Sequence, residues 1–177
     1  MLDLSQFQIE LDVRKQTPYF QSTPERRIRF LMEDLTASQL KNILQTIFQE
    51  DRSIHLLFVA AYIHRHRRYS AKARVGSSIT IRNWKEHIVQ EEADHTGVVY
   101  AHVKHVRLDE IISYCIKVYR GHSQAYIVFF DSDFLLYVST DVVDIIGDAT
   151  SISHSRKHML NFTTNYTMIL IIRFVTN

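Results

Sequence analysis

The feature that most constrains the fold is a pair of β-rich runs in the second half of the chain. Ala125–Phe130 and Phe134–Ser139 are rich in aromatic and branched apolar residues, and Asp131-Ser132-Asp133 separates them. Aspartate and serine favour turns because their short side chains hydrogen-bond to the local backbone. The pattern therefore predicts a β-hairpin here.

Helix signals dominate the first half. Thr23, Pro24 and Glu25 predict a helix that runs to about Leu35, because they match an N-cap, a first-turn proline and a dipole-matched acid. A second helix is predicted after Thr36, which forms a T-x-x-Q capping box and precedes apolar residues at helical spacing: Leu40, Ile43, Leu44, Ile47 and Phe48.

The next apolar segment, Leu56–Ile63, is open to two interpretations. Ser53 is placed to cap a third helix, apolar on nearly every side and followed by arginines. A buried strand over the same residues fits the sequence as well.

The remaining signals alternate between helix and strand. Trp84 and Ile88, four residues apart, predict a short helix, and Val98–Val106 predicts a strand. A helix over Leu108–Tyr119, closed by Gly121, follows. After the hairpin we expect one helical turn at Asp141–Ile146 and a buried last strand at Tyr166–Val175.

These elements predict an α+β protein with an N-terminal helical layer packed on a mostly antiparallel sheet from the C-terminal half. The 177 residues suit a single domain, 1–177. Within it, 1–95 is expected to be mainly helical, and 96–177 to run strand, helix, hairpin, helix, strand.

The chain carries features of a cytoplasmic protein. Cys115 is the single cysteine, which excludes an intramolecular disulfide and fits a reducing compartment. The first twelve residues lack the apolar core of a signal peptide, and no apolar run is long enough to span a bilayer. We expect a cytoplasmic location and no membrane partner.

Charge is unevenly distributed although the net charge is only +2. From Arg52 to Lys85 there are eight basic residues and no acid. From Glu86 to Asp148 there are eleven acids and four bases, so this part carries 4 − 11 = −7. The two halves are therefore electrically opposed.

The basic loop 64–74 has the residue types that bind nucleic acid. Its cations suit phosphates and Tyr69 suits stacking on a base. The cations are Arg65, Arg67, Arg68, Lys72 and Arg74. The alternative is a helix end whose cations bind helix carbonyls and pair with the acidic segment.

The acidic segment also has two interpretations. Its acids belong either to solvated helix faces and turn caps, or to a docking surface for a cationic partner. The candidate partner-binding residues are Asp131, Asp133, Asp141, Asp144, Glu91 and Glu92.

No catalytic constellation, metal site or cofactor motif is predicted. His154 and His158 lack the glutamate of H-E-x-x-H, and Arg156 and Lys157 would repel a cation. Cys115 is expected to be an inert core residue. A nuclease built from histidine, lysine and tyrosine leaves no spacing signature, so the sequence does not exclude it.

The stretch 125–147, AYIVFFDSDFLLYVSTDVVDIIG, resembles a hairpin and following turn of small bacterial immunity proteins, including those of contact-dependent growth inhibition systems. The resemblance implies a non-enzymatic cytoplasmic α+β protein, which neutralises a cognate toxin domain, often a nuclease, by a protein–protein interaction that blocks its active site. It also implies that Asp131, Asp133, Asp141 and Asp144 contact the toxin.

We therefore expect a bacterial immunity protein, a toxin inhibitor. The alternative is a nucleic-acid-binding protein or nuclease that uses the basic loop 64–74.

Overall fold

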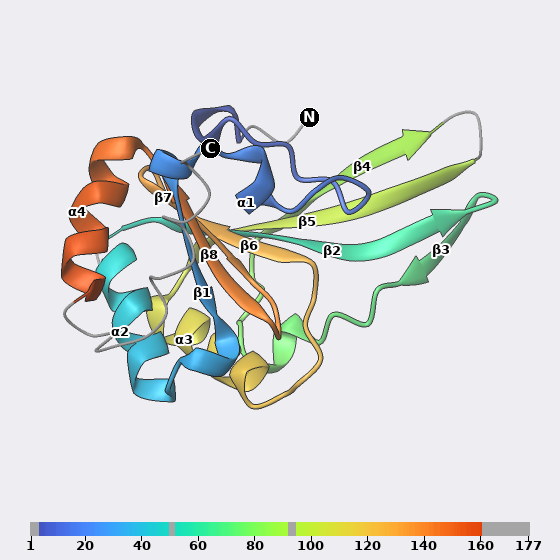
Figure 1. The fold of residues 1–177 in the computed structure, drawn as a ribbon. Helices are drawn as coiled ribbons and strands as arrows, with labels where there is room; N and C mark the ends of the chain where they lie inside the picture. Colours follow the sequence, from blue (N-terminus) through green and yellow to red (C-terminus); the bar gives the residue numbers. More distant parts are fainter. Residues whose placement is uncertain (1–3, 50–51, 92–94, 161–177) are drawn as a thin grey trace.

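The computed structural model describes residues 4–49, 52–91 and 95–160 (Figure 1). The α-helices are α1 Pro18–Gln21, α2 Ala37–Ile47, α3 Leu108–Tyr119 and α4 Ala149–Leu160. The short 3-10 helices are η1 Ser5–Phe7, η2 Pro24–Arg26, η3 Met32–Asp34 and η4 Val75–Ser77. The strands are β1 Arg27–Leu31, β2 Ile54–His64, β3 Arg67–Ser70, β4 Trp84–Glu91, β5 Thr96–Val106, β6 Ile127–Phe130, β7 Phe134–Val138 and β8 Val142–Gly147.

All of these strands belong to one eight-stranded sheet, and every pair is antiparallel. Seven strands follow the order β1-β8-β7-β6-β2-β5-β4, and β3 pairs with β2 beside this path. β2 therefore lies at the centre, with β5 along one edge and β6 and then β3 along the other.

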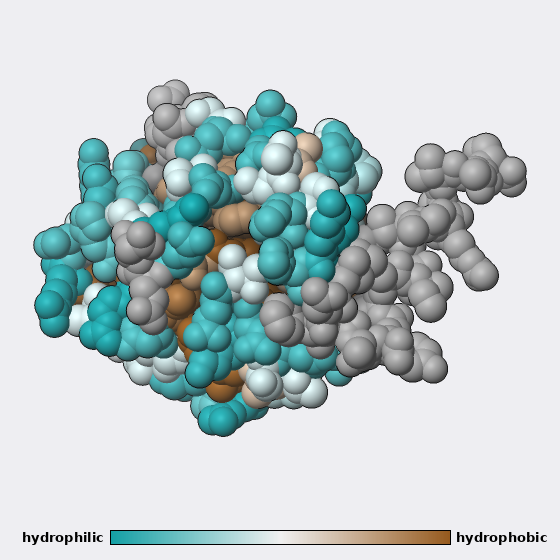
Figure 2. All heavy atoms as spheres, turned by 90° about the vertical axis from the view of Figure 1, so that its left-hand side faces the viewer, coloured by the Kyte–Doolittle hydropathy of each residue, from teal (hydrophilic) through white to brown (hydrophobic). Residues whose placement is uncertain are grey.

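Three helices cover one face of the sheet (Figure 1). Alternate strand residues such as Leu56, Phe129 and Leu136 point into this layer, where they meet Leu44 of α2 and Ile111 of α3. On the side of the molecule that bears α4, Figure 2 shows mostly hydrophilic side chains, with apolar atoms in the gaps between them. Each helix thus buries its apolar stripe against the sheet.

The opposite face is covered by the N-terminal segment. Leu4, Phe7 and Ile9 pack there on the outward-facing strand residues, among them Leu57 and Leu135. This cover extends over the middle of the sheet but does not reach its far end (Figure 1).

Beyond this cover, four strands project from the molecule (Figure 1). We call this part, formed by β3, β4 and the facing parts of β2 and β5 (residues 60–70, 84–91 and 95–103), the arm. A β-bulge between Val59 and Ala61 lies where β2 enters the arm. We call the rest of the sheet with its helices the body.

Several sequence predictions are confirmed. The α+β class is correct, and Thr36 and Gln39 form the predicted capping box of α2, with the Gln39 amide donating to Thr36 Oγ1 at 3.2 Å. α3 spans Leu108–Tyr119 and is followed by Gly121 at a φ of 82°. The hairpin forms as β6 and β7.

Four helix predictions are wrong. The segment predicted as a helix from Pro24 to Leu35 contains β1, whose burial alternates along the strand. Leu56–Ile63 lies in the strand β2, as its alternative interpretation proposed, and the part of it up to Val59 is covered on both faces. Trp84–Ile88 lies in β4, and Asp141–Ile146 lies mostly in β8.

The predicted division into a helical first half and a strand-bearing second half is also wrong. Residues before 96 supply β1, β2, β3 and β4, half of the sheet. The helical layer draws on both halves of the chain, since it contains α2, α3 and α4. The predicted strand Tyr166–Val175 lies outside the described residues. Among the described helices, none is long and apolar enough to cross a membrane.

Candidate nucleic-acid interface

The basic loop of the sequence is a hairpin at the end of the arm. β2 and β3 pair from Ala61–Ser70 to His64–Arg67, so Arg65 and His66 form a two-residue turn. Both have positive φ, 47° and 64°, which matches the turn that suits the twist of a hairpin. A positive φ is energetically unfavourable for residues other than glycine, and two-residue hairpin turns usually contain Asn-Gly. Here the chain has a cationic and an ionisable side chain at these two positions.

A row of apolar and aromatic side chains crosses the arm on one face. The register places Tyr69 opposite Tyr62, Tyr62 opposite Val98, and Val98 opposite Val89. Residues directly opposite each other on antiparallel strands point to the same face. Tyr69 is 51% exposed, Tyr62 43% and Val89 40%, so both tyrosines start from opposite positions on one face and are open to solvent. We call this the arm face.

Positive and ionisable groups flank the tyrosines on the arm face. Toward the tip, His64 pairs with Arg67, two residues from Tyr62 and Tyr69 respectively. Toward the body, Lys85 pairs with His102. The register also places Glu91, opposite Thr96, on this face. The face therefore combines exposed aromatic side chains with cationic and ionisable groups.

The other face of the arm differs. Arg68 points there and donates to Glu86 at 2.9 Å, and this ion pair lowers the pKa of the Glu86 carboxyl. Trp84 lies on the same side, opposite Val103, and is 52% exposed. Each face of the arm thus carries one arginine and at least one exposed aromatic side chain, so substitutions on one face can serve as controls for those on the other.

The structure separates the five cations that the sequence predicted as a group. Arg65 and Arg67 lie at the tip, and Arg68 points to the opposite face. Lys72 and Arg74 follow β3 in an irregular segment, each with positive φ. The alternative prediction is wrong about a helix end, since 64–70 is hairpin, but one of the pairings it predicted with the acidic segment is present, Arg68–Glu86.

A group of histidines lies at the base of the arm. His55 Nδ1 and His102 Nε2 are 3.0 Å apart, and both rings pack beside Phe130. His87 lies near His102, with its Nε2 buried and without a hydrogen-bond partner. Burial, aided by neighbouring cations, lowers the pKa of His102 to about 4, and it lowers the pKa of His55 and His87 as well.

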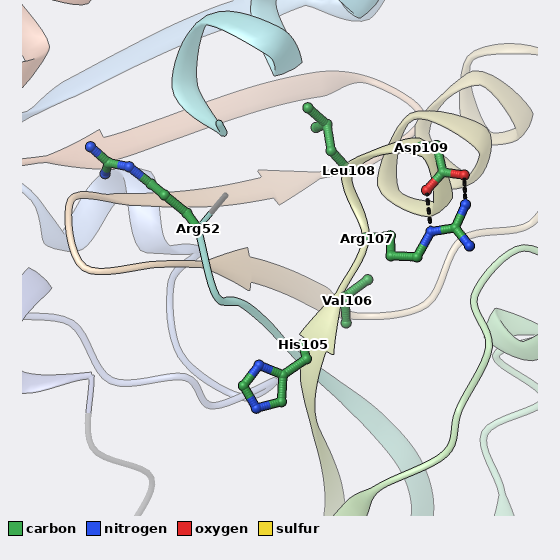
Figure 3. Close-up of a pocket in the computed structure, with 6 residues that line it drawn as sticks. All are labelled: Arg52, His105, Val106, Arg107, Leu108 and Asp109. Atoms are coloured by element: carbon green, nitrogen blue, oxygen red, sulfur yellow. Dashed lines mark hydrogen bonds and ion pairs between the residues drawn. The ribbon is translucent and has the colours of Figure 1, made fainter. Parts of the chain in front are cut away.

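Two cavities adjoin this base. One, of about 550 Å³, is lined by Arg52, His105, Val106, Arg107, Leu108 and Asp109 (Figure 3). Arg107 turns away from its centre and pairs with Asp109 (Figure 3). The other, of about 400 Å³, is lined by Gln6, Arg52, Ser53, His55, Phe130, Asp131 and Ser132. Arg52 lines both.

The predicted acidic contacts have internal partners or lie apart. Asp144 is fully buried and accepts two hydrogen bonds from Arg29, at 2.6 and 2.8 Å. Asp131 caps its own turn by accepting from the amides of Asp133 and Phe134.

Asp131 and Asp133 both pair with Arg52. Asp141 is exposed just before β8. Glu91 ends β4, and Glu92 lies outside the described residues. The structure therefore does not gather these six residues into one acidic surface.

The remaining predicted features are placed as follows. Cys115 is buried in the helix-covered core, and burial raises the pKa of its thiol, as expected of an inert residue. His154 and His158 stack on α4. In the part of the chain that the structure describes, no group of three or more histidine, cysteine or acidic side chains is arranged to hold a metal ion.

Sequence reasoning missed Tyr62, His55 and His102. Their shared face depends on strand pairing and on the bulge in β2, which no local pattern reveals. In comparisons with known proteins, no family model matches the chain, and no curated protein or solved structure is detectably similar. The resemblance of 125–147 to immunity proteins therefore stays a prediction.

Proposed function

We propose that the chain is a nucleic-acid-binding protein that holds a single strand on the arm face. The observation that carries the proposal is the exposed pair Tyr62–Tyr69, flanked by Arg67 on one side and Lys85 on the other. Stacking of a base on an aromatic ring contributes about 1–3 kcal/mol and tolerates any base. Cations beside the rings attract the phosphates.

A single strand fits this surface better than a duplex. The bases of a duplex are already stacked on each other, whereas unpaired bases are free to stack on protein rings. The arm face is an open sheet surface on which neighbouring strands lie about 4.8 Å apart, so the rings of Tyr62 and Tyr69 meet successive bases. This arrangement resembles other sheet platforms for single strands in its physics.

The stacking is tested by fluorescence anisotropy with fluorescein-labelled 12-nucleotide RNA, DNA and duplex DNA. We expect Tyr62→Ala and Tyr69→Ala each to weaken single-strand binding roughly 5- to 100-fold. Trp84→Ala is the matched control, because it removes an equally exposed ring from the opposite face. Equal losses in all three variants, or tighter binding of duplex, would contradict the proposal.

The electrostatic part is tested by two neighbouring arginines. Arg67→Gln removes a cation from the arm face, so the dependence of log affinity on log salt should become shallower by about one. Arg68→Gln removes one from the other face, where Glu86 already pairs with it, and should leave the slope nearly unchanged. An identical effect of both changes would show that the contacts are not confined to the arm face.

A second candidate, inhibition of a cognate toxin as an immunity protein, is favoured by the edge of the sheet. β4 pairs only with β5 among the described strands, and Trp84 and Ile88 are exposed on it. An open edge with apolar side chains is suited to adding a strand from another protein. We propose this edge, rather than the acidic residues, as the surface for a toxin domain.

Affinity purification from the native cell after nuclease treatment tests this candidate. Mass spectrometry should detect a toxin domain with the wild-type chain but not with Ile88→Asp, which places a charge in the proposed contact. Single-strand binding should survive in the same variant. Absence of a toxin domain from the wild-type sample would count against the inhibitor.

A further inference from the structure

The His55–His102 pair is built by the register of the central strands. His102 is next to Ala101, the partner of Phe58, and lies opposite Leu57, while His55 pairs with Phe130 on the other edge of β2. The 3.0 Å contact joins His55 Nδ1 to His102 Nε2. When Nδ1–H of His55 donates to His102, the lone pair on His55 Nε2 is left free to accept a proton.

A second imidazole is turned toward the same corner by an irregular backbone. A register shift in β5 lies opposite Ile54–Leu56, and within it His105 has a φ of 58°. Bulges re-aim side chains, and strained backbone of this kind concentrates at functional sites. His105 Nδ1 lies 3.0 Å from Ser53 Oγ, two residues before His55.

Both histidines line solvent-accessible cavities that share one arginine. His55 borders the cavity of about 400 Å³ and His105 the cavity of about 550 Å³, and Arg52 lines both. His102 continues toward Lys85 on the arm face. The N-terminal segment covers Tyr100 between the tyrosines and this corner, where Val13 N donates to the Tyr100 hydroxyl. A strand bound on the arm face therefore reaches the corner along β4, past Val89, His87 and Lys85.

We propose that this corner cleaves single-stranded RNA without a metal ion, with His55 as general base and His105 as general acid. The inference rests on the proposed function, because the arm face supplies the substrate. Two imidazoles and a cation are sufficient for this chemistry, since the RNA carries its own nucleophile.

The reaction is a transesterification. His55 Nε2 takes the proton of a ribose 2′-hydroxyl, and the 2′-oxygen forms a bond to the adjacent phosphorus. The bond from phosphorus to the 5′-oxygen of the next nucleotide breaks, and His105 Nε2–H protonates that oxygen. The products are a 2′,3′-cyclic phosphate and a free 5′-hydroxyl. Arg52 is the cation that lines both cavities. Because it pairs with Asp131 and Asp133, the phosphate must displace these carboxylates for Arg52 to offset the charge that develops on its oxygens.

The surroundings suit these roles. Burial lowers the pKa of His55, so its ring is uncharged at neutral pH and able to accept a proton. His102 is a positioning residue, since it fixes the His55 ring through the hydrogen bond and does not touch the substrate. Ser53 Oγ lies 3.0 Å from His105 Nδ1, and it orients the His105 ring in the same way by accepting a hydrogen bond when that nitrogen carries a proton.

The test uses the full chain, a 12-nucleotide single-stranded RNA and EDTA. We expect products ending in a 2′,3′-cyclic phosphate, and no cleavage of the DNA or 2′-O-methyl RNA of the same sequence. His55→Ala and His105→Ala should each slow cleavage roughly 100-fold or more. His154→Ala, which removes an exposed histidine on α4, is the matched control and should leave the rate unchanged.

Binding is measured separately on the uncleavable 2′-O-methyl RNA. Tight binding without cleavage would overturn this inference and leave the proposed function intact, whereas absence of binding would overturn both. His55→Gln, checked by circular dichroism, guards against a folding defect in the alanine variant. His102→Asn should shift the pH profile of kcat/KM, and an unchanged profile would remove its positioning role.

Discussion

The body and the arm are built on the same strands but differ in cover. In the body, side chains on both faces of the sheet are fully buried, such as Leu56 and Leu57 on β2. A few residues along the same strand, Tyr62 is exposed to nearly half of its surface. Burial of apolar area is the main favourable contribution to the free energy of folding, so most of the stability of the molecule comes from the body. In the arm, the exposed side chains are available to contact a ligand.

The same contrast holds for charge. The body buries the ion pair Arg29–Asp144 between β1 and β8, whereas the arm carries Arg68–Glu86 in solvent. Burial raises the pKa of the Asp144 carboxyl, and the hydrogen bonds from Arg29 oppose this effect. An arginine–carboxylate pair is therefore buried in the body but exposed to solvent in the arm, so we expect its loss to reduce stability more in the body.

The largest loss of stability is expected for a substitution that removes a buried ion pair of the body. Asp144→Ala leaves Arg29 partly buried without its carboxylate, and breaking such a pair costs about 3–5 kcal/mol. Urea denaturation with Asp141→Ala as control, an exposed acid three residues earlier, measures the difference. A loss below about 1 kcal/mol in Asp144→Ala would mean that solvent reaches the pair.

An intermediate effect is expected at the junction of body and arm. The pKa of His102 falls from 6.5 to about 4 on folding, so below pH 6.5 the unfolded chain binds a proton that the folded chain excludes. Stability should therefore be full above pH 6.5 and decline as pH falls toward 4. His55 and His87 shift in the same direction.

Burial is the main cause of the lowered pKa of these histidines, and the charged groups around the rings modify it. Lys85, Lys104 and the other two histidines disfavour a further positive charge on His102, while Asp131 acts on His55 in the opposite sense. Allowing for solvent screening, His102 should account for roughly 1–2 kcal/mol between pH 7.5 and 4.5. Urea melts of the wild type and His102→Asn test this, and parallel pH dependences would contradict it.

The smallest effect is expected in the arm. Glu86→Gln removes the partner of Arg68 in solvent, and exposed ion pairs contribute about 0–1 kcal/mol. Thermal unfolding should change by no more than a few degrees. A larger loss would mean that the arm contributes to the stability of the body, and would weaken the distinction between the two regions.

Local signals predicted the elements whose causes are local. The capping box of Thr36 and the turn at Asp131 involve residues within three positions of each other, and both were predicted. The helix–strand ambiguity at Leu56–Ile63 arises because the first half of this strand is covered on both faces, so its residues are apolar without a period of two.

The wrong predictions share a physical cause. Trp84 and Ile88, four residues apart, share a face in a helix and in a strand alike, so their spacing did not distinguish the two. The local sequence predicted Asp144 to lie in a helical turn, but the residue it pairs with, Arg29, is 115 residues away in sequence. The arm face could not be predicted from the sequence for the same reason, because it depends on which strands pair and in which register.

The bulge at Val59–Ala61 decides which side of the molecule Tyr62 occupies. Ala60 is one residue more on β2 than the pairing with Tyr100 and Val99 requires, so the in–out alternation of the strand reverses its phase there. If Ala60 instead took the regular place opposite Val99, Tyr62 would lie opposite Gly97, on the side of Trp84, whereas deleting Ala60 would leave Tyr62 opposite Val98. One residue left out of the strand pairing, without any change of charge or aromatic content, thus decides which side of the protein carries the ligand platform.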